Sequence, residues 1–373
     1  MTHSVTINFS GNSVIAPTDS TATPGTAAVP AVLQYKNYVY AIYAASDPNN
    51  PSIWQLAYDG TSWQGNQRIG WGASANASYP MTSCAPGLAA LKNTLYLAWI
   101  DQSSASDSEG TIYIASASTS ATSRSPIAPT DWQPLTGTYV NGMPGPVAGS
   151  QGLAMIAFPY NGVDSLWVFY NNGKGNLCVA IAQPAATTTG VNWVYANTIQ
   201  SWTENANPNA PMNPKLSGLP AAAVINSVPY VVFIGSSGSY LNSIYLDLST
   251  NNWAGNQHIS VDKGNPLDLK AGSTPNLLAF SPPGKGSLNF AMLFYQGIHG
   301  TSIDLSTYVA GKWYGNISID FLSGLLGPGI NPTTKIGIGS AMSGLTQMVM
   351  VYPSASSSSD QDLWAAYATI TVT

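Results

Sequence analysis

Short runs of alternating apolar and polar residues recur along the chain, and no long stretch repeats apolar residues at helical spacing. One segment returns with Trp at its start, Gly-Asn two positions later and an apolar residue at its end. Its clearest copies are 63–69 (WQGNQRI), 253–259 (WAGNQHI) and 313–319 (WYGNISI), with weaker copies after Trp132 and Trp193. These tryptophans recur about every 60 to 70 residues, which is the signature of a repeat architecture.

Three further apolar patterns precede each Trp segment. The first is built from small residues, the second ends in an aromatic residue, and the third carries a short apolar pair. Four short strands per repeat are typical of one blade of a β-propeller, whose inner strands crowd around an axis and require small side chains. We expect the repeated Trp to pack between blades and the Gly-Asn pair to form a bulge in the outer strand.

The last repeat stops before a fourth strand, and the missing piece lies at the other end of the chain. Residues 9–15 (FSGNSVI) match the Trp-x-Gly-Asn pattern, with Phe9 in the Trp position. The sequence therefore predicts an all-β fold, a six-bladed β-propeller of four-stranded antiparallel blades, closed when the N-terminal strand joins the C-terminal blade. We expect one domain over 1–373, with blades at about 29–69, 85–135, 150–199, 219–259, 274–319 and 337–373 plus 5–16.

Composition favours neutral ligands. Charged residues make up 7% of the chain, the formal net charge is −5, and Lys and Arg form no cluster. This pattern argues against nucleic-acid binding, and no apolar run is long enough for membrane insertion. Sugars fit the many Asn, Ser, Tyr and Trp residues, because they offer hydroxyl groups and C–H faces. The sequence leaves open whether the chain forms a homo-oligomer.

Two further features concern redox state and location. Cys84 and Cys178 are too few for a disulfide framework, so we expect free, partly buried thiols. The N-terminus has neither a basic region nor an apolar region of a signal peptide. We expect a cytoplasmic or non-classically secreted protein, unless a signal has been removed.

Candidate binding residues lie in the long loops that share one face of the expected propeller. Trp71 and Trp202 fall outside the repeat, where core packing gives no obvious reason for an indole, although both could act as lids over the blade ends. The candidate ligand-binding residues are Trp71, Tyr79, Asp101, Trp202, Glu204, Asn205 and His299.

No catalytic signature stands out. A sialidase-type site needs three arginines, and the chain has only Arg68 and Arg124. Asp101, Glu204 and Asp262 could supply the two carboxylates of another glycosidase, but nothing in the sequence selects them. No nucleophile elbow, metal-ligand spacing or phosphate loop is present, so we predict no catalytic residue, no metal and no cofactor.

The segment 53–63 (IWQLAYDGTSW) resembles the repeats of fungal and bacterial β-propeller lectins, including the fucose-binding six-bladed and tectonin-like families. The resemblance implies sugar binding between adjacent blades through aromatic stacking and a few polar groups. Fucose-binding members repeat an Arg and a Glu in each pocket, and neither repeats here, which favours one or a few divergent sites.

The predicted function is that of a lectin-like carbohydrate-binding protein without catalytic activity. We expect it to bind neutral glycans in loop-lined or inter-blade pockets, with glycans or glycoconjugates as its partners. A glycoside hydrolase with an unrecognised carboxylate pair and a protein-interaction scaffold are the alternatives.

Overall fold

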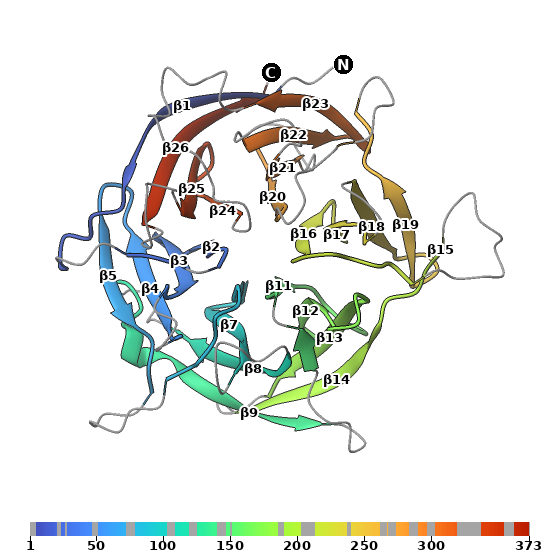
Figure 1. The fold of residues 1–373 in the computed structure, drawn as a ribbon, viewed down its shortest axis with the longest axis horizontal. Helices are drawn as coiled ribbons and strands as arrows, with labels where there is room; N and C mark the ends of the chain where they lie inside the picture. The colour runs from blue at the N-terminus through green and yellow to red at the C-terminus, as the bar shows by residue number, and fades with distance from the viewer. Residues whose placement is uncertain are drawn as a thin grey trace. The chain divides into compact units, whose positions relative to one another are not determined.

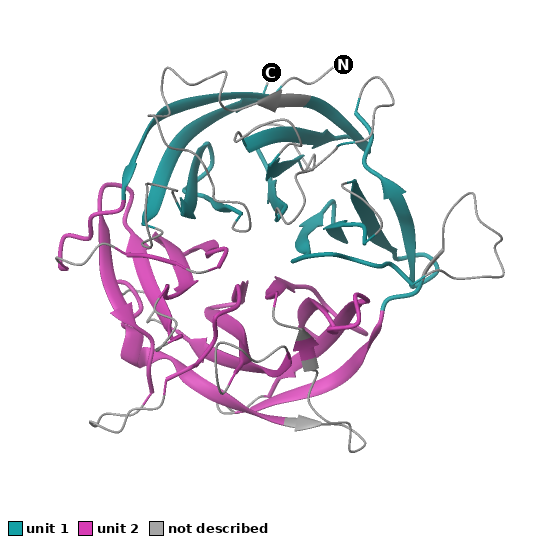
Figure 2. Ribbon diagram, viewed as in Figure 1, with its two compact units in different colours: residues 1–14, 199–373 teal, residues 15–198 magenta. Residues whose placement is uncertain are grey.

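The structure is a computed structural model. It describes residues 5–20, 24–26, 28–46, 51–71, 79–102, 109–118, 125–139, 147–149, 151–185, 190–202, 213–236, 240–261, 267, 274–282, 290–296, 303–318, 337–353 and 362–372. Regular structure in these residues is β-strand, apart from one 3-10 helix, η1 (Pro129–Asp131), so the all-β prediction is confirmed. The chain forms two compact units, which Figure 2 colours separately: unit 1 is Met1–Val14 with Ile199–Thr373, and unit 2 is Ile15–Thr198.

Unit 1 contains three sheets, each built on an antiparallel meander of four strands (Figure 1). The first comprises β16 (Ala221–Ile225), β17 (Val228–Ile234), β18 (Leu241–Asp247) and β19 (Asn252–His258). The second comprises β20 (Asn276–Phe280), β21 (Phe290–Gln296), β22 (Ile303–Val309) and β23 (Lys312–Ser318). The third comprises β24 (Gly339–Met342), β25 (Gln347–Pro353), β26 (Leu363–Val372) and, as its outer strand, β1 (Val5–Val14).

The N-terminal strand completes the C-terminal sheet, as the sequence predicts. β1 pairs antiparallel with β26 from Val5↔Val372 to Val14↔Trp364, and the register shifts between Phe9 and Gly11. Phe9 is 4% exposed and belongs to the core between the second and third sheets of unit 1. Phe9 therefore takes the buried position at which other repeats have Trp.

Unit 2 contains one four-stranded sheet and one large sheet. The four-stranded sheet comprises β2 (Ala31–Tyr35), β3 (Tyr38–Ala44), β4 (Ile53–Tyr58) and β5 (Trp63–Arg68). The large sheet joins two meanders through a parallel pairing of their outer strands, β9 and β14. Its members are β6 (Gly87–Leu91), β7 (Thr94–Asp101), β8 (Glu109–Ala117) and β9 (Gln133–Tyr139), then β11 (Leu153–Ala157), β12 (Leu166–Asn171), β13 (Leu177–Pro184) and β14 (Gly190–Thr198).

Two short strands lie where the sequence predicts only loops. β10 (Val147–Gly149) pairs with β8, and β15 (Ser201–Trp202) pairs in parallel with the outer strand β19. Their backbone groups pair with strand edges that would otherwise be left open. Strands of two or three residues are too short to show a periodic pattern in the sequence.

The outer strands carry the predicted bulges. Register shifts occur opposite Gly65, Gly255 and Gly315, and these glycines have φ of +75°, +93° and +68°. A Cβ on Gly255 would lie 2.9 Å from the Ser243 carbonyl oxygen, so both the backbone conformation and the space require glycine there.

Each apolar core cluster lies between two neighbouring meanders of one unit. In unit 2 one cluster joins β2–β5 to β6–β9 and another joins β6–β9 to β11–β14. In unit 1 one joins β16–β19 to β20–β23 and another joins β20–β23 to the third sheet. Meanders packed face to face in this way are the packing unit of a propeller.

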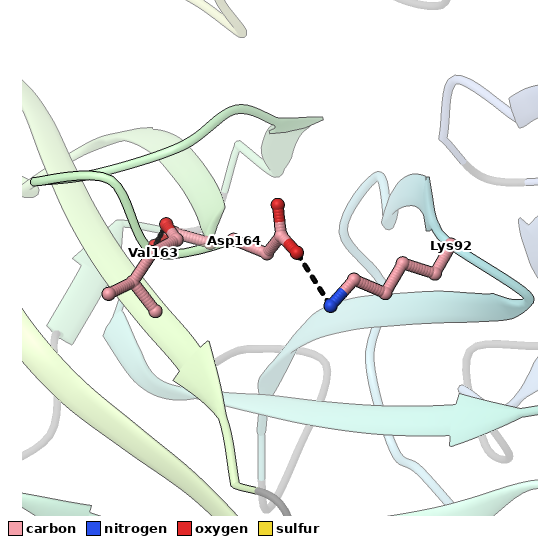
Figure 3. A network of polar contacts seen from close by, with 4 residues as sticks. Lys92, Val163 and Asp164 are labelled. Carbon is pink, nitrogen blue, oxygen red and sulfur yellow. Dashed lines mark hydrogen bonds and ion pairs between the residues drawn. The ribbon is translucent and has the colours of Figure 1, made fainter.

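Polar contacts at the turns add little to this packing. Lys92 Nζ lies 2.7 Å from Asp164 Oδ2, linking the β6–β7 turn to the β11–β12 connection (Figure 3). Both side chains are exposed, so solvent screens the pair. Cys84 and Cys178 are free, as predicted, but both are buried rather than partly buried, since they lie in an apolar core cluster. No helix in the described part of the chain is long and apolar enough to cross a membrane.

Candidate functional site

A pocket of about 580 Å³ lies in unit 1 between sheet β16–β19 and sheet β20–β23. Its walls come from strands β17, β18 and β19 on one side and from β22, the β22–β23 turn and β23 on the other. A volume of this size accommodates a small ligand. We call it the inter-sheet pocket.

Aromatic rings form much of the wall of the inter-sheet pocket. Tyr230 and Tyr245 lie directly opposite each other on β17 and β18, with their rings stacked at 5.4 Å and 26°. Tyr308 and Trp313 are opposite each other on β22 and β23, with ring centroids 5.1 Å apart at 60°. Tyr314, which also lines the pocket, is 39% exposed. Cross-strand pairing thus places one aromatic pair on each side.

The two aromatic pairs meet through their phenol groups. The hydroxyl oxygens of Tyr230 and Tyr308 are 2.9 Å apart, and their rings are 5.5 Å apart. Burial, with the hydrogen bond to Tyr308, raises the pKa of Tyr230 above its ordinary value. One hydroxyl donates within the pair, so the proton of the other is free to serve a second acceptor.

The phenol groups elsewhere in the fold give a testable pH dependence. Burial raises the pKa of Tyr40 to about 12 and that of Tyr352 to about 12, from an ordinary value of 10.0. The unfolded chain loses these protons near pH 10 while the folded protein retains them. Stability is therefore unaffected below pH 10 and falls as the pH rises through about 12.

We expect the buried phenol groups of Tyr40 and Tyr352 to ionise only together with unfolding. Tyrosinate absorbance and circular dichroism, followed against pH, would show this late ionisation and the loss of structure together. Ionisation of all 20 tyrosines in one step near pH 10, with the dichroism unchanged, would contradict this.

Polar groups line the rest of the inter-sheet pocket. Ser243 and Gln257 lie opposite each other on β18 and β19, and the bulge at Gly255 follows directly. His258 and Lys312 are exposed and supply nitrogen donors from the two sheets. Ring faces combined with hydroxyl, amide and amine groups suit a polar ligand that has an apolar face.

A corresponding interface exists in unit 2, between β2–β5 and β6–β9. Tyr40 lies opposite Ala57 on the second and third strands of its sheet, as Tyr230 lies opposite Tyr245. The two interfaces differ in two ways. The residue on the third strand is Tyr245 in unit 1 and Ala57 in unit 2, and the connection that follows, β22–β23 in unit 1 and β8–β9 in unit 2, differs in length.

In unit 2 that connection fills the interface. The Ile127 backbone N–H donates to the Tyr40 hydroxyl at 2.9 Å, and Gln55 Nε2 donates to the Ile127 carbonyl at 2.6 Å. Trp132 is fully buried and donates from Nε1 to Gln55 Oε1 at 2.7 Å, which confirms that this repeated Trp packs between meanders. In unit 1 the corresponding strands β22 and β23 are joined by a two-residue turn, which is too short to place a similar segment in the space.

Three of the residues singled out from sequence have described side chains, and all lie in unit 2. Trp71 is partly buried and packs on Trp99 at 5.5 Å, and Trp99 Nε1 donates to Asp101 Oδ1 at 3.2 Å. The structure thus brings Trp71 and Asp101 into contact with one indole, that of Trp99. Tyr79 packs against Arg68, whose guanidinium lies 3.6 Å from its ring centroid.

The structure describes less of the other four candidates. Trp202 lies in β15, where it is the backbone partner of Ala254. Glu204, Asn205 and His299 lie outside the described residues. Of the candidates whose side chains the structure describes, neither Trp71, Tyr79 nor Asp101 lines the inter-sheet pocket. Within the described residues no group of three or more His, Cys, Asp or Glu could hold a metal ion.

The sequence analysis does not single out the aromatic residues of the pocket, because they belong to the repeat and their pattern is typical of packing residues. Two departures from the repeat could have signalled them. Tyr245 occupies a position where the first repeat has Ala57, and the turn before Trp313 is much shorter than the segment before Trp132.

Comparison with known proteins identifies the fold. No protein-family model matches the chain, and neither does any curated protein. An α-L-arabinanase of Penicillium chrysogenum complexed with arabinobiose superposes with a TM-score of 0.56 at 14% identity, over 96% of this chain and 98% of that one. A fungal lectin of Aleuria aurantia, described as a six-bladed β-propeller with a novel fucose recognition mode, gives 0.55 at 13% identity, over 90% and 91%. The fold is that of a β-propeller.

A sialidase of Trypanosoma rangeli is also similar, with a TM-score of 0.52 at 12% identity, over 96% of this chain and 59% of that one. At these identities the likeness concerns the fold alone. The propeller neighbours include a sugar-binding protein and sugar-cleaving enzymes, so the fold leaves both activities open.

Proposed function

We propose that this propeller has six four-stranded blades and binds carbohydrate without cleaving it, as a lectin-like protein that uses the inter-sheet pocket. Counting the two meanders of the large sheet as separate blades gives three blades in each unit. The glycan partners would then meet an inter-blade pocket of the kind that the sequence resemblance implies.

One observation carries the proposal: the inter-sheet pocket combines ring faces with neutral hydroxyl and amide groups. Tyr245 and Trp313 are only partly buried, so part of each ring stays accessible to a ligand. Sugar rings present C–H faces to aromatic side chains and hydroxyl groups to polar ones. The Tyr230–Tyr308 hydroxyl pair would give the site both a donor and an acceptor at its base.

A glycan array probed with the purified, labelled chain tests the proposal. We expect binding to a restricted class of oligosaccharides, competed by the free sugar. Absence of binding to every class would contradict it.

A hydrolase remains the second candidate because an arabinanase and a sialidase share the fold. Asp101 ends β7 and Glu109 begins the neighbouring strand β8, so two carboxylates lie at one end of this sheet. Mass spectrometry of the bound oligosaccharides after long incubation separates the two functions. Intact oligosaccharides support binding alone, whereas shortened products would support the hydrolase.

A further inference from the structure

The inter-sheet pocket carries two basic side chains in a protein that has few. The chain contains 11 Lys and Arg residues and 3 His residues among 373. Lys312 and His258 both line this pocket, and they come from its two sides, one from sheet β20–β23 and one from sheet β16–β19. No Asp or Glu is among the described residues that line it.

Both basic groups are placed to meet a ligand. Lys312 begins β23, directly before Trp313, and is exposed. His258 ends β19, is exposed, and its ring packs against Tyr240 at 4.8 Å, which restrains its orientation. Its imidazole offers an N–H donor in either protonation state.

Two other basic residues of the described chain already have partners. Lys92 pairs with the Asp164 carboxylate, and Arg68 lies over the Tyr79 ring. Within the described residues, neither Lys312 nor His258 has a carboxylate within ion-pair distance. A ligand anion could therefore satisfy both without displacing a protein partner.

We propose that the saccharide recognised by the inter-sheet pocket carries an anionic group, either a uronic acid carboxylate or a sulfate ester. This inference rests on the proposed carbohydrate binding. The apolar face of the sugar ring lies on the aromatic wall, and the anion accepts charge-assisted hydrogen bonds from Lys312 and a hydrogen bond from His258. A neutral sugar would leave the Lys312 ammonium without a counter-charge in the complex.

Matched saccharide pairs test this inference by isothermal titration calorimetry. One pair is an oligogalacturonate with its neutral methyl ester, and the other is a sulfated oligosaccharide with its desulfated form. We expect the anionic member of one pair to bind about ten-fold more tightly. The preference should shrink when salt is raised from about 50 mM to about 500 mM, because salt screens exposed charges. The pair that shows the preference identifies the anion.

Variants locate the effect. Lys312→Gln should remove the preference while leaving the weaker binding of the neutral partner, and His258→Gln should reduce it. Lys174→Gln changes the net charge equally on an exposed turn of unit 2, and it should leave the preference intact. Equal binding of charged and neutral members would overturn the anionic specificity alone. Absence of binding to all members, together with an empty glycan array, would contradict carbohydrate binding itself.

Discussion

A chain that lacks residues 1–14 is expected to lose most of the stability of unit 1. This deletion removes β1, so the whole ladder from Val5↔Val372 to Val14↔Trp364 is lost and the edge of β26 is left open. It also removes Phe9 from the core and the hydrogen bond from Asn12 Nδ2 to the Tyr352 hydroxyl at 2.9 Å. We expect a fall in melting temperature of more than about 10 °C, or aggregation.

Point variants and a peptide make this prediction specific. Phe9→Ala alone should lower the unfolding free energy by about 3 to 5 kcal/mol, because it opens a cavity in a packed core. Val14→Ala, at a position 36% exposed on the same strand, is the matched control and should change it by less than about 0.5 kcal/mol. A synthetic peptide of residues 1–16 added to the truncated chain should restore the melting temperature. A truncated chain that melts like the intact one would show that β1 is dispensable.

Tyr245→Ala is expected to weaken glycan binding by about 10- to 100-fold. The substitution removes one ring face of the inter-sheet pocket, and burying an apolar side chain is worth about 1.5 to 3 kcal/mol. Tyr245 is only partly buried, so the melting temperature should fall little.

Two controls separate binding from folding. Tyr245→Phe keeps the ring and should retain most of the affinity. Tyr195→Ala removes a ring that is 36% exposed on β14 of unit 2, and affinity should not change. Glycan affinity is measured by calorimetry and folding by thermal denaturation. Full affinity of the Tyr245→Ala protein would place the binding site elsewhere, and the partly buried Trp71 would then be the next residue to substitute.

The sequence predicts the scaffold better than the site, for a physical reason. Bulges at Gly65 and Gly255 and the pairing of 5–14 with the final strand follow from local rules and from one repeated motif. The pocket instead depends on the length of one connection, which differs between repeats. A segment that carries Ile127 and Trp132 fills one interface, and a two-residue turn leaves the corresponding one open.

Pairings made only by backbone groups were also beyond prediction. The parallel ladder between β9 and β14 joins Gly190 to Thr136 and Trp193 to Tyr139, and it merges two meanders into one sheet. No side-chain pattern marks such an edge-to-edge contact, since each strand already has its antiparallel partner. The short strands β10 and β15 arise in the same way.

The pairing of β1 with β26 also sets the order of events during synthesis. The hydrogen bond from Ser10 Oγ to the Tyr367 carbonyl joins residues 357 positions apart. Residues 5–14 therefore stay unpaired until residues 363–372 have been synthesised, whereas each other meander can form from neighbouring residues. Contacts so distant in sequence form slowly, and a waiting strand is open to association with other chains. A nascent chain of this protein thus needs residues 5–14 kept apart from other strands until residues 363–372 have been synthesised.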